Sequence, residues 1–452
     1  MSTKPHTQEH NARRGQTPFW LGCYQIFLIL FGFWYLVLRL IRGKEIPGLR
    51  ERLAWYSGSA KKSLAGLRRP IWIHLVSVGE VLAAEPFIRE FRRRFPEKQW
   101  VITTVTPTGR TLAQRLIRGS QGRLLYLPWD LSPVVSRALR AIRPSFFISF
   151  ETELWPVLFQ RLNRSNVPIV IVNGRISPRA YRRYLWIRPF MERTLGLVTF
   201  FFTQSPQDAR RYAGIGAPKD RIAVTGNVKW DLPVSGNGQT LPENSFRSLA
   251  GLPTGHLLWT AGSTHPGEEL LVLQAYQQVK SKIPGIRLLI APRHPERCAE
   301  VEQTVKSVGL SSIRRSALGN GAENDSVIVL DTLGELISVY QASDLVFVGG
   351  SLVPHGGHNL IEPAAFSRPI LTGPHLNNFQ AVAEALAQAN GMVVVRSTEE
   401  LGSALLRLAA DPISRADLGR RAFNVIQEHR GATLRTVERV LQIAQRAGVF
   451  TS

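Results

Sequence analysis

Short runs of apolar residues recur along the chain and alternate with longer amphipathic stretches. In the first half these runs are IWIHLV, WVITTV, LLYLP, FFISF, IVIV and TFFFT, at residues 71–76, 100–105, 124–128, 146–150, 169–172 and 199–203. Helix-length segments such as EVLAAEPFIREFRRRF separate them. Apolar runs of strand length are typical of strands buried on both faces, and the helical segments between them indicate a parallel, doubly wound sheet.

A break rich in Pro, Gly, Ser and Asn interrupts this rhythm at residues 232–245, and the alternation then restarts. The later runs are LLWTAGS, RLLIAPR, VIVLDT, LVFVGGS, PILTG and MVVVRS, at residues 257–263, 287–293, 327–332, 345–351, 369–373 and 392–397. We therefore expect an α/β protein with two Rossmann-like domains that face a cleft. The predicted domains are 41–231 and 246–452, joined by the linker, and the last helices are candidates to pack on the first domain.

One segment near the start is apolar without alternation. Residues 17–38 carry no charge, and about 22 helical residues span roughly 33 Å, enough to cross a bilayer core. No small-residue cleavage site follows, and residues 39–69 contain nine Lys or Arg against two Glu. The pattern predicts a tail over 1–16 and a retained membrane anchor over 17–40, with the rest of the chain in the cytoplasm. A helix in the membrane interface or in a protein core is the alternative.

The charge of the chain points to anionic partners. Its 452 residues include 56 Lys and Arg against 33 Asp and Glu, a net charge of +23. Such a surface attracts nucleic acid, an anionic membrane or phosphorylated substrates. The basic, aromatic stretch at 175–193 taken alone suits RNA, but beside an anchor it fits anionic head groups better. Because the charge is spread over two enzyme-like domains, we do not expect nucleic acid as a partner.

The densest candidate site is GGSLVPHGGHNLIEP, residues 349–363, which follows a strand and precedes a predicted helix. Gly356 and Gly357 allow backbone amides to approach a ligand, and Asn359 is placed to cap the helix. Glu362 is suited to accept hydrogen bonds from ribose hydroxyls. The spacing matches neither the dinucleotide fingerprint nor the P-loop, so the stretch predicts a different phosphate site. A glycine-rich turn without a ligand is the alternative.

Metal binding is not expected at this loop. His358 and Glu362 have a spacing that could place two ligands on one helical face, but no third His, Cys or Asp stands at metal spacing nearby. We therefore predict neither a metal nor a cofactor.

Three glutamates follow strands of the first half. Glu80 lies in the first turn of a helix after the strand at 71–76, where a carboxylate is either a helix cap or a general base. Glu151 and Glu153 lie just beyond the strand at 146–150. Paired carboxylates suit acid and base roles, but alternation sends them to opposite sides if the strand continues. Spacing leaves both questions open.

Several basic residues also stand at strand ends. Arg110 follows the strand at 100–105, and Arg293 and Arg297 follow the strand at 287–293. A guanidinium binds planar anions through paired hydrogen bonds, so each is a candidate for a phosphate or carboxylate, with a solvated arginine as the alternative. Lys229, beside the linker, is a similar candidate.

These motifs together resemble the 3-deoxy-D-manno-octulosonic acid (Kdo) transferases of lipopolysaccharide assembly. The resemblance runs from about residue 48 to about residue 430. It rests on the ordered set SVGE, TPTGR, ETELWP, GNVKWD, PRHPER, DTLGEL, GGSLVPHGGHNLIEP and GPHLNNF. Each motif alone is weak, but the ordered set is specific.

The resemblance implies a GT-B glycosyltransferase that is anchored in the inner membrane with its domains on the cytoplasmic side. The donor would be CMP-Kdo, the acceptor a phosphorylated lipid A precursor, and the reaction inverting, with Glu80 as general base. It places the donor on Arg293, Ser351, Gly356, Gly357, His358, Asn359 and Glu362. It places the sugar and acceptor near Arg110, Glu151, Glu153 and Lys229.

Competing functions remain at this stage. A related GT-B glycosyltransferase with another donor, or a sugar-nucleotide epimerase of the same architecture, fits the two domains equally well. A soluble epimerase substrate needs no anchor, so the apolar segment favours a transferase. A membrane-tethered nucleic-acid-binding protein is disfavoured by the distribution of charge.

Overall fold

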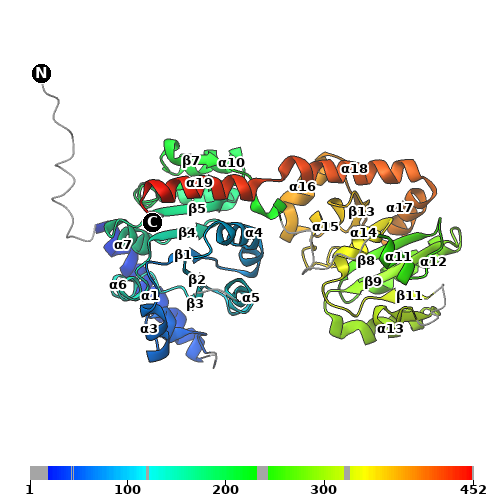
Figure 1. Cartoon of the computed structure of the whole chain (residues 1–452), viewed down its shortest axis with the longest axis horizontal. Helices are drawn as coiled ribbons and strands as arrows, with labels where there is room; N and C mark the ends of the chain where they lie inside the picture. Colours follow the sequence, from blue (N-terminus) through cyan, green and yellow to red (C-terminus); the bar gives the residue numbers. More distant parts are fainter. Residues whose placement is uncertain are drawn as a thin grey trace, which may run out of the picture. The chain divides into compact units, whose positions relative to one another are not determined.

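The computed structural model describes residues 19–41, 43, 45–118, 122–231, 243–319 and 326–449. The chain forms two compact units, one from Met1–Leu232 with Gly431–Ser452 and one from Pro233–Arg430 (Figure 1). The predicted tail at 1–16 and residues 232–242 of the predicted linker lie outside the described residues.

The N-terminal unit contains one seven-stranded parallel sheet in the order β3-β2-β1-β4-β5-β6-β7. Its strands are β1 (Ile71–His74), β2 (Trp100–Thr104), β3 (Gly122–Tyr126), β4 (Phe146–Phe150), β5 (Ile169–Gly174), β6 (Phe200–Thr203) and β7 (Ile222–Val224). All six predicted strands are present. The sequence pattern missed β7, a three-residue edge strand that is only partly buried and lies between the polar residues Arg221 and Thr225.

Helices cover both faces of this sheet. They are α1 (Phe19–Ile41), α2 (Leu49–Arg52), α3 (Gly58–Ala65), α4 (Val78–Arg94), α5 (Pro107–Ile117), α6 (Ser132–Ile142), α7 (Pro156–Arg164), α8 (Pro178–Trp186), α9 (Arg188–Leu195), α10 (Pro206–Gly214) and α19 (Ala432–Arg446), with 3-10 turns η1 (Lys219–Arg221) and η2 (Val228–Asp231). Figure 1 shows α4 and α5 on one side of β1 to β3 and α6 and α7 on the other. Alternate residues of β1 divide between the two cores: Trp72 packs with α6 and α7, whereas Ile71 and Ile73 pack with α4 and α5.

The C-terminal unit repeats this architecture. Its parallel sheet has the order β10-β11-β9-β8-β12-β13-β14. The strands are β8 (Leu257–Thr264), β9 (Ile286–Pro292), β10 (Ser312–Arg314), β11 (Val327–Val329), β12 (Leu345–Val348), β13 (Ile370–Thr372) and β14 (Val393–Val394). The helices are α11 (Glu243–Leu249), α12 (Glu268–Lys280), α13 (Cys298–Ser307), α14 (Leu336–Ala342), α15 (Ile361–Ala364), α16 (Gln380–Gln388), α17 (Thr398–Ala410) and α18 (Pro412–His429), with 3-10 turns η3 (Pro295–Arg297), η4 (Arg315–Ala317) and η5 (Asn377–Phe379). Again the six predicted strands are present, and a three-residue edge strand, β10, was missed.

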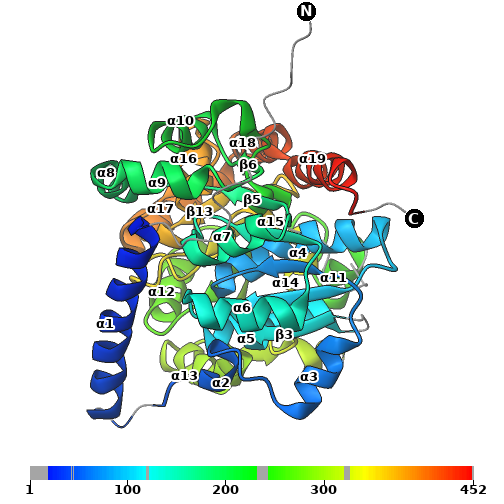
Figure 2. The same cartoon turned by 90° about the vertical axis from the view of Figure 1, so that its left-hand side faces the viewer.

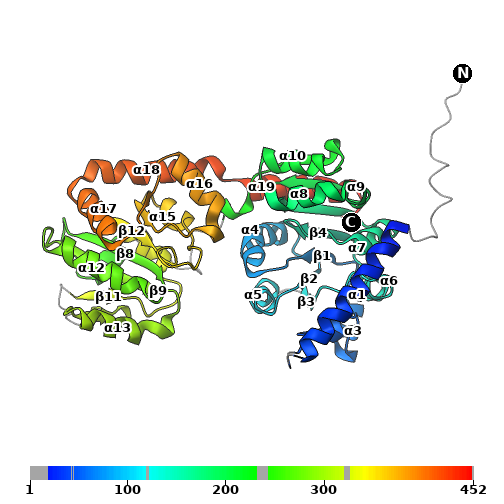
Figure 3. The same cartoon turned by 180° about the vertical axis from the view of Figure 1, so that it is seen from behind.

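The apolar N-terminal segment forms the 23-residue helix α1, which is long and apolar enough to cross a membrane and is little buried (Figure 3). Its first turns nevertheless contact the N-terminal unit. The rings of Trp20 and Tyr24 lie 5.2 Å and 5.6 Å from that of Phe190, and the Ser132 amide donates to Gln25 Oε1 at 2.8 Å. One side of α1 therefore packs on protein, while large apolar side chains on its other positions are exposed.

The last helix, α19, returns to the N-terminal unit. Val437, Val440 and Ala444 are fully buried in the same core as α4. The Asp231 carboxylate accepts hydrogen bonds from the amides of Gly431 and Thr433, at 2.7 Å and 2.5 Å, and so caps the start of the helix. The N-terminal unit is thus completed by residues from the other end of the chain.

Candidate active site

The carboxyl edge of the N-terminal sheet brings three glutamates together. The strand order reverses between β1 and β4, and ligands of open α/β sheets collect at such a point. Glu80 follows β1, whereas Glu151 and Glu153 follow β4. The charges of both later glutamates act on Glu80, so the three carboxylates form one cluster.

Glu80 is both a helix cap and a perturbed acid. The Val76 amide donates to Glu80 Oε2 at 2.8 Å, and the Ser77 hydroxyl, which caps α4, donates to Oε1 at 3.3 Å. The side chain is largely buried, with 7 % exposed. Burial raises the pKa of Glu80 to about 8, and the nearby carboxylates add to this, while the Val76 hydrogen bond opposes it. Glu80 can therefore serve as helix cap and as base. The capping hydrogen bonds hold its carboxyl group in place, and burial raises the pKa of that group.

Glu151 and Glu153 share the cluster but have different neighbours. The strand ends at Phe150, and Glu151 has a left-handed backbone with φ of 56°, so strand alternation does not separate the two side chains. Lys229 Nζ lies 3.0 Å from Glu151 Oε1. Burial, with the Glu151 charge, raises the pKa of Glu153 to about 7. Near neutral pH the cluster thus holds one carboxylate paired with a lysine, that of Glu151, and two groups that titrate, Glu80 and Glu153.

A buried histidine lies beside Glu153. His74 Nε2 is 3.9 Å from Glu153 Oε2, and His74 Nδ1 is 3.2 Å from the Thr103 carbonyl oxygen. Burial lowers the pKa of His74 to about 3, so its ring is neutral. With Nδ1 donating to Thr103, Nε2 faces Glu153 as an acceptor. The sequence analysis did not select His74, because it is one position of an apolar strand.

Arg110 lies in a separate ion pair. Its guanidinium donates to both oxygens of Glu51, at 2.7 Å and 3.2 Å, and its Cζ lies 4.5 Å from the centre of the Tyr126 ring. Glu51 also accepts the Tyr126 amide at 2.9 Å. No hydrogen bond or ion pair in the described chain joins Arg110 to the glutamate cluster. The structure therefore gives it a role in fastening α2 to α5 and β3.

In the C-terminal unit, the glycine loop after β12 encloses a carboxylate of the protein itself. Glu268 is fully buried and accepts the amides of Gly350, Ser351 and Leu352, at 2.6 Å, 2.9 Å and 2.9 Å, as well as that of His265. The amides at the start of the loop thus already have an anionic partner. They do not await a ligand.

The expectation for the two later glycines needs a correction. The Gly357 amide donates to the Gly350 carbonyl oxygen at 2.7 Å, so it is not open to a ligand. Both residues have positive φ, and a Cβ would come within 2.7 Å of Asn378 at Gly356 and within 2.8 Å of Leu376 at Gly357. Glycine is required here mainly by backbone conformation and packing. The amides of Gly356, His358 and Asn359 donate no hydrogen bond within the described residues and are the ones left for an anion.

The helix after the loop is shorter than predicted. It consists of the single turn α15, which starts after His358, so His358 and Glu362 do not share a helical face. Asn359 does cap it, because Asn359 Oδ1 accepts the Ile361 amide at 3.0 Å, and its Nδ2 donates to Glu362 Oε1 at 3.0 Å. Burial raises the pKa of Glu362 to about 7, although the hydrogen bond from Asn359 and the charge of Arg293 both act to lower it. Asn359 therefore orients Glu362.

His358 pairs with a second histidine that the sequence reading overlooked. Its Nε2 lies 2.8 Å from Nε2 of His265, and the two rings are parallel at 5.1 Å. Burial and the Arg293 charge lower the pKa of His358 to about 4, so its ring is neutral, and burial with the nearby His355 also lowers the pKa of His265. The short distance between the two ring nitrogens requires that one of them carries a hydrogen and the other accepts it. The segment GSTHPGEE, which spans the end of β8, contains His265 and Glu268, and the adjacency of β8 and β12 in the sheet brings the loops that follow them together.

Of the remaining candidates in this unit, Arg297 and Ser351 already have partners within the protein, whereas Arg293 is exposed. Arg297 binds Glu300 and Glu269, and the buried Ser351 hydroxyl donates to the Val348 carbonyl oxygen at 2.6 Å and accepts the Gly373 amide at 2.8 Å. Arg293 is exposed, and no ion pair of the described residues uses its guanidinium. No group of three His, Cys, Asp or Glu among the described residues has a geometry that could hold a metal.

Comparison with known proteins decides the family. Residues 47–232 match the family model described as 3-deoxy-D-manno-octulosonic-acid transferase. A 3-deoxy-D-manno-octulosonic acid transferase of Haemophilus influenzae is 37 % identical over 394 residues, which cover 87 % of this chain and 91 % of the relative. The chain belongs to the Kdo transferase family. It is a glycosyltransferase.

Other comparisons agree. A 3-deoxy-D-manno-octulosonic acid transferase of Bordetella pertussis is 31 % identical to this Kdo transferase over 398 residues, which cover 85 % of this chain and 90 % of the relative. A structure of a UDP-N-acetylglucosamine 2-epimerase homologue from Listeria monocytogenes superposes with a TM-score of 0.52 at 14 % identity, over 85 % of this chain and 98 % of that chain. At that identity the likeness concerns the fold alone, and it confirms the expected pair of Rossmann-like domains.

Proposed function

We propose that this Kdo transferase moves Kdo from CMP-Kdo to a sugar hydroxyl of a phosphorylated lipid A precursor, with inversion at the anomeric carbon. The observation that carries the proposal is the glutamate cluster, in which a fixed and buried Glu80 has a pKa of about 8. A base with that pKa is matched to a proton that an attacking hydroxyl loses near neutral pH. Nucleic acid is not part of the proposal.

The reaction follows from the placement of Glu80. The ionised Glu80 accepts the proton of the acceptor hydroxyl as that oxygen forms a bond to the anomeric carbon of Kdo. The bond from that carbon to the phosphate oxygen breaks, and CMP leaves with the electron pair. Lys229, paired with Glu151, supplies positive charge at the same edge of the sheet, where we place the sugar and its carboxylate.

We place the nucleotide on the C-terminal unit. The unpaired amides of Gly356, His358 and Asn359 and the guanidinium of Arg293 are suited to the single phosphate of CMP. Glu362, held by Asn359, is suited to the ribose hydroxyls. Ser351 and Gly357 support this loop from within rather than touching the donor, and Arg110 supports the acceptor unit in the same way.

We further propose that α1 attaches the enzyme to the inner membrane with both units on the cytoplasmic side. Support comes from its exposed apolar side chains and from the nine basic residues that follow within residues 39–69. Attachment would bring the active site to a substrate that is itself embedded in the membrane.

The test is a transfer assay with the full chain, CMP-Kdo and a dispersed tetra-acylated lipid A precursor, followed by product lipid and released CMP. For the wild type we expect both products in equal amounts. Glu80→Gln should keep CMP binding and lose at least about two orders of magnitude in rate, the usual size of a general-base contribution.

Glu85→Gln is the matched control, since Glu85 lies on the same helix and, among the described residues, pairs at the surface with Arg89 alone, at 2.9 Å. It should retain full activity. A wild type that releases no CMP with intact CMP-Kdo and well-dispersed lipid would contradict the proposed reaction, and an active Glu80→Gln would leave Glu80 as a cap only.

A further inference from the structure

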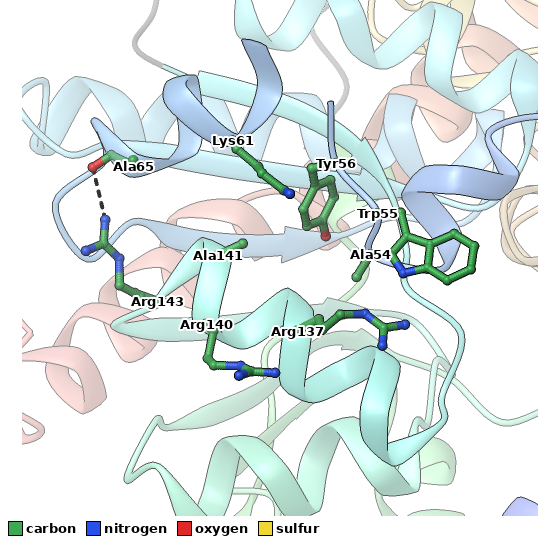
Figure 4. A pocket seen from close by; sticks show the side chains of 9 residues that line it. All are labelled: Ala54, Trp55, Tyr56, Lys61, Ala65, Arg137, Arg140, Ala141 and Arg143. Carbon is green, nitrogen blue, oxygen red and sulfur yellow. Dashed lines mark hydrogen bonds between the residues drawn. The ribbon is translucent and has the colours of Figure 1, made fainter. Parts of the chain in front are cut away.

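One cavity of the N-terminal unit lies apart from the glutamate cluster. It has a volume of about 740 Å³ and lies between α6 and the segment that joins α2 to α3 (Figure 4). Trp55 and Tyr56 come from that segment and Lys61 from α3, whereas Arg137 and Arg140 come from α6 and Arg143 directly follows it. None of the roles described above uses this cavity.

The lining is basic and contains no acidic side chain. Arg137 and Arg140 lie three residues apart on α6, Arg143 follows the end of that helix, and Lys61 comes from α3. Arg143 donates to the carbonyl oxygens of Ala65 and Leu67 and so holds the two elements together. Like charges that line one cavity repel one another, and an anion bound among them would relieve that repulsion.

Two aromatic residues give this cavity the features of a binding site. Trp55 is 58 % exposed at its rim, with the Arg137 guanidinium 5.7 Å from the centre of its ring. Tyr56 is only 5 % exposed, and its hydroxyl has no hydrogen-bond partner within the described residues. Burial raises the pKa of Tyr56, so the group stays a donor. Buried tyrosine hydroxyls are normally paired, so this donor lacks its partner.

The position in the fold separates the cavity from the reaction. Arg143 immediately follows α6 and precedes the start of β4, whereas Glu151 follows the end of β4. The five residues of β4 span about 16 Å. The cavity also lies soon after the apolar helix in the sequence, since α1 ends at Ile41 and α2 begins at Leu49, and Figure 2 shows α3 and the end of α1 towards the same edge of the unit.

We propose that this cavity binds the phosphate head group of an anionic membrane lipid. The cations neutralise the phosphate, the Tyr56 hydroxyl donates a hydrogen bond to one of its oxygens, and Trp55 lies at the level of the membrane interface, which tryptophan favours. The inference rests on the proposed membrane attachment but not on the transfer chemistry.

The test compares lipids that remain bound to the full-length protein in detergent, by native mass spectrometry, after addition of phosphatidylglycerol or phosphatidylcholine. We expect preferential retention of phosphatidylglycerol. Lys61→Gln and Arg140→Gln should each weaken it about fivefold, the usual effect of one cation at an anionic surface. Tyr56→Phe should weaken it about threefold or more without a change in charge, because it removes one hydrogen-bond donor.

Lys62→Gln is the matched control, since this neighbouring exposed lysine of α3 does not line the cavity. An equal loss in Lys61→Gln and Lys62→Gln, or an unchanged Tyr56→Phe, would mean a diffuse basic surface and would overturn the site. Displacement of phosphatidylglycerol by an equal concentration of inorganic phosphate would overturn the assignment to a lipid. Kdo transfer to micellar acceptor should persist in all these variants, so failure of the site is distinguishable from failure of the proposed reaction.

Discussion

At the scale of single residues, the proton affinity of Glu80 is the property that matters most for the proposed chemistry. The surroundings raise its pKa by burial and by two neighbouring carboxylates, and only the Val76 and Ser77 hydrogen bonds favour the charged form. An acid of this kind is protonated in much of the free enzyme at neutral pH. The binding of substrate and the local pH then decide how much of the active base is present.

This reasoning predicts a rising pH profile. Below about pH 8 the active, ionised form of Glu80 should fall tenfold per pH unit, so kcat/KM should rise with a slope of about one and level off above that value. The measurement is initial rate against pH at low substrate concentration, in buffers of constant ionic strength. The Glu85→Gln variant should keep the profile, and a profile that is flat below pH 8 would exclude Glu80 as the titrating base.

A second residue-scale prediction concerns Glu268. Four amides donate to its two oxygens inside the unit, so a glutamine, with one acceptor oxygen and a donor NH₂ group, leaves at least one amide facing another donor. Glu268→Gln should lower the free energy of unfolding by about 2 to 4 kcal/mol. Chemical denaturation of the purified protein measures it.

Glu296→Gln is the control for that change, because the Glu296 side chain is 76 % exposed near His294 and its loss should cost little. Similar stability of both variants would show that the loop does not depend on the buried carboxylate.

The site residues that were not predicted from the sequence have partners that are distant along the chain. Glu80, the paired glutamates and Asn359 were recognisable because each stands beside a strand or helix end. Glu268 was not, since it acts on amides more than 80 residues later, and neither was Glu51, which engages Arg110 from 59 residues earlier. The spacing of a motif predicts only contacts between residues that are close along the chain, whereas these contacts depend on which strands are adjacent in the sheet.

At the scale of elements, the apolar pattern predicted every strand except the two short edge strands. Helix ends were harder to predict. The helix after the glycine loop is a single turn, because the residues that follow form a turn that ends at Ser367, whose backbone is left-handed with φ of 56°. The region predicted as linker already begins α11 at Glu243. The apolar segment near the start of the chain was correctly predicted to be a helix. The packing of its first turns on the N-terminal unit is visible only in the structure.

The exposed side of α1 leads to a prediction about attachment. Leu30 is 66 % exposed in the middle of the helix, so Leu30→Arg should weaken membrane association by about 100-fold, given a cost of about 2.5 to 3.5 kcal/mol for a central arginine in a bilayer. Fractionation of membranes at moderate salt measures it. Phe19→Arg, at the end of the same helix, allows the arginine to reach the interface and should have little effect. Equal behaviour of the two variants would mean that α1 does not lie in the acyl layer.

At the scale of the whole molecule, the N-terminal unit depends on a helix from the far end of the chain. Asp231→Ala removes the carboxylate that caps α19 and should lower the free energy of unfolding of this unit by about 1 to 2 kcal/mol. Thermal unfolding followed by fluorescence measures it. Asp220→Ala, at an exposed position of the same unit, is the control, and an equal loss there would show that the cap has no special role.

The return of α19 also has a consequence for biosynthesis. When the ribosome has made the N-terminal unit as far as Leu232, the residues that complete its core are still about 200 residues from being translated. At roughly 5 to 20 residues per second the delay is about 10 to 40 s, during which the part of this core that α19 covers stays exposed. The first unit made is therefore not the first unit finished, and the nascent chain presents a natural binding surface to chaperones until translation ends.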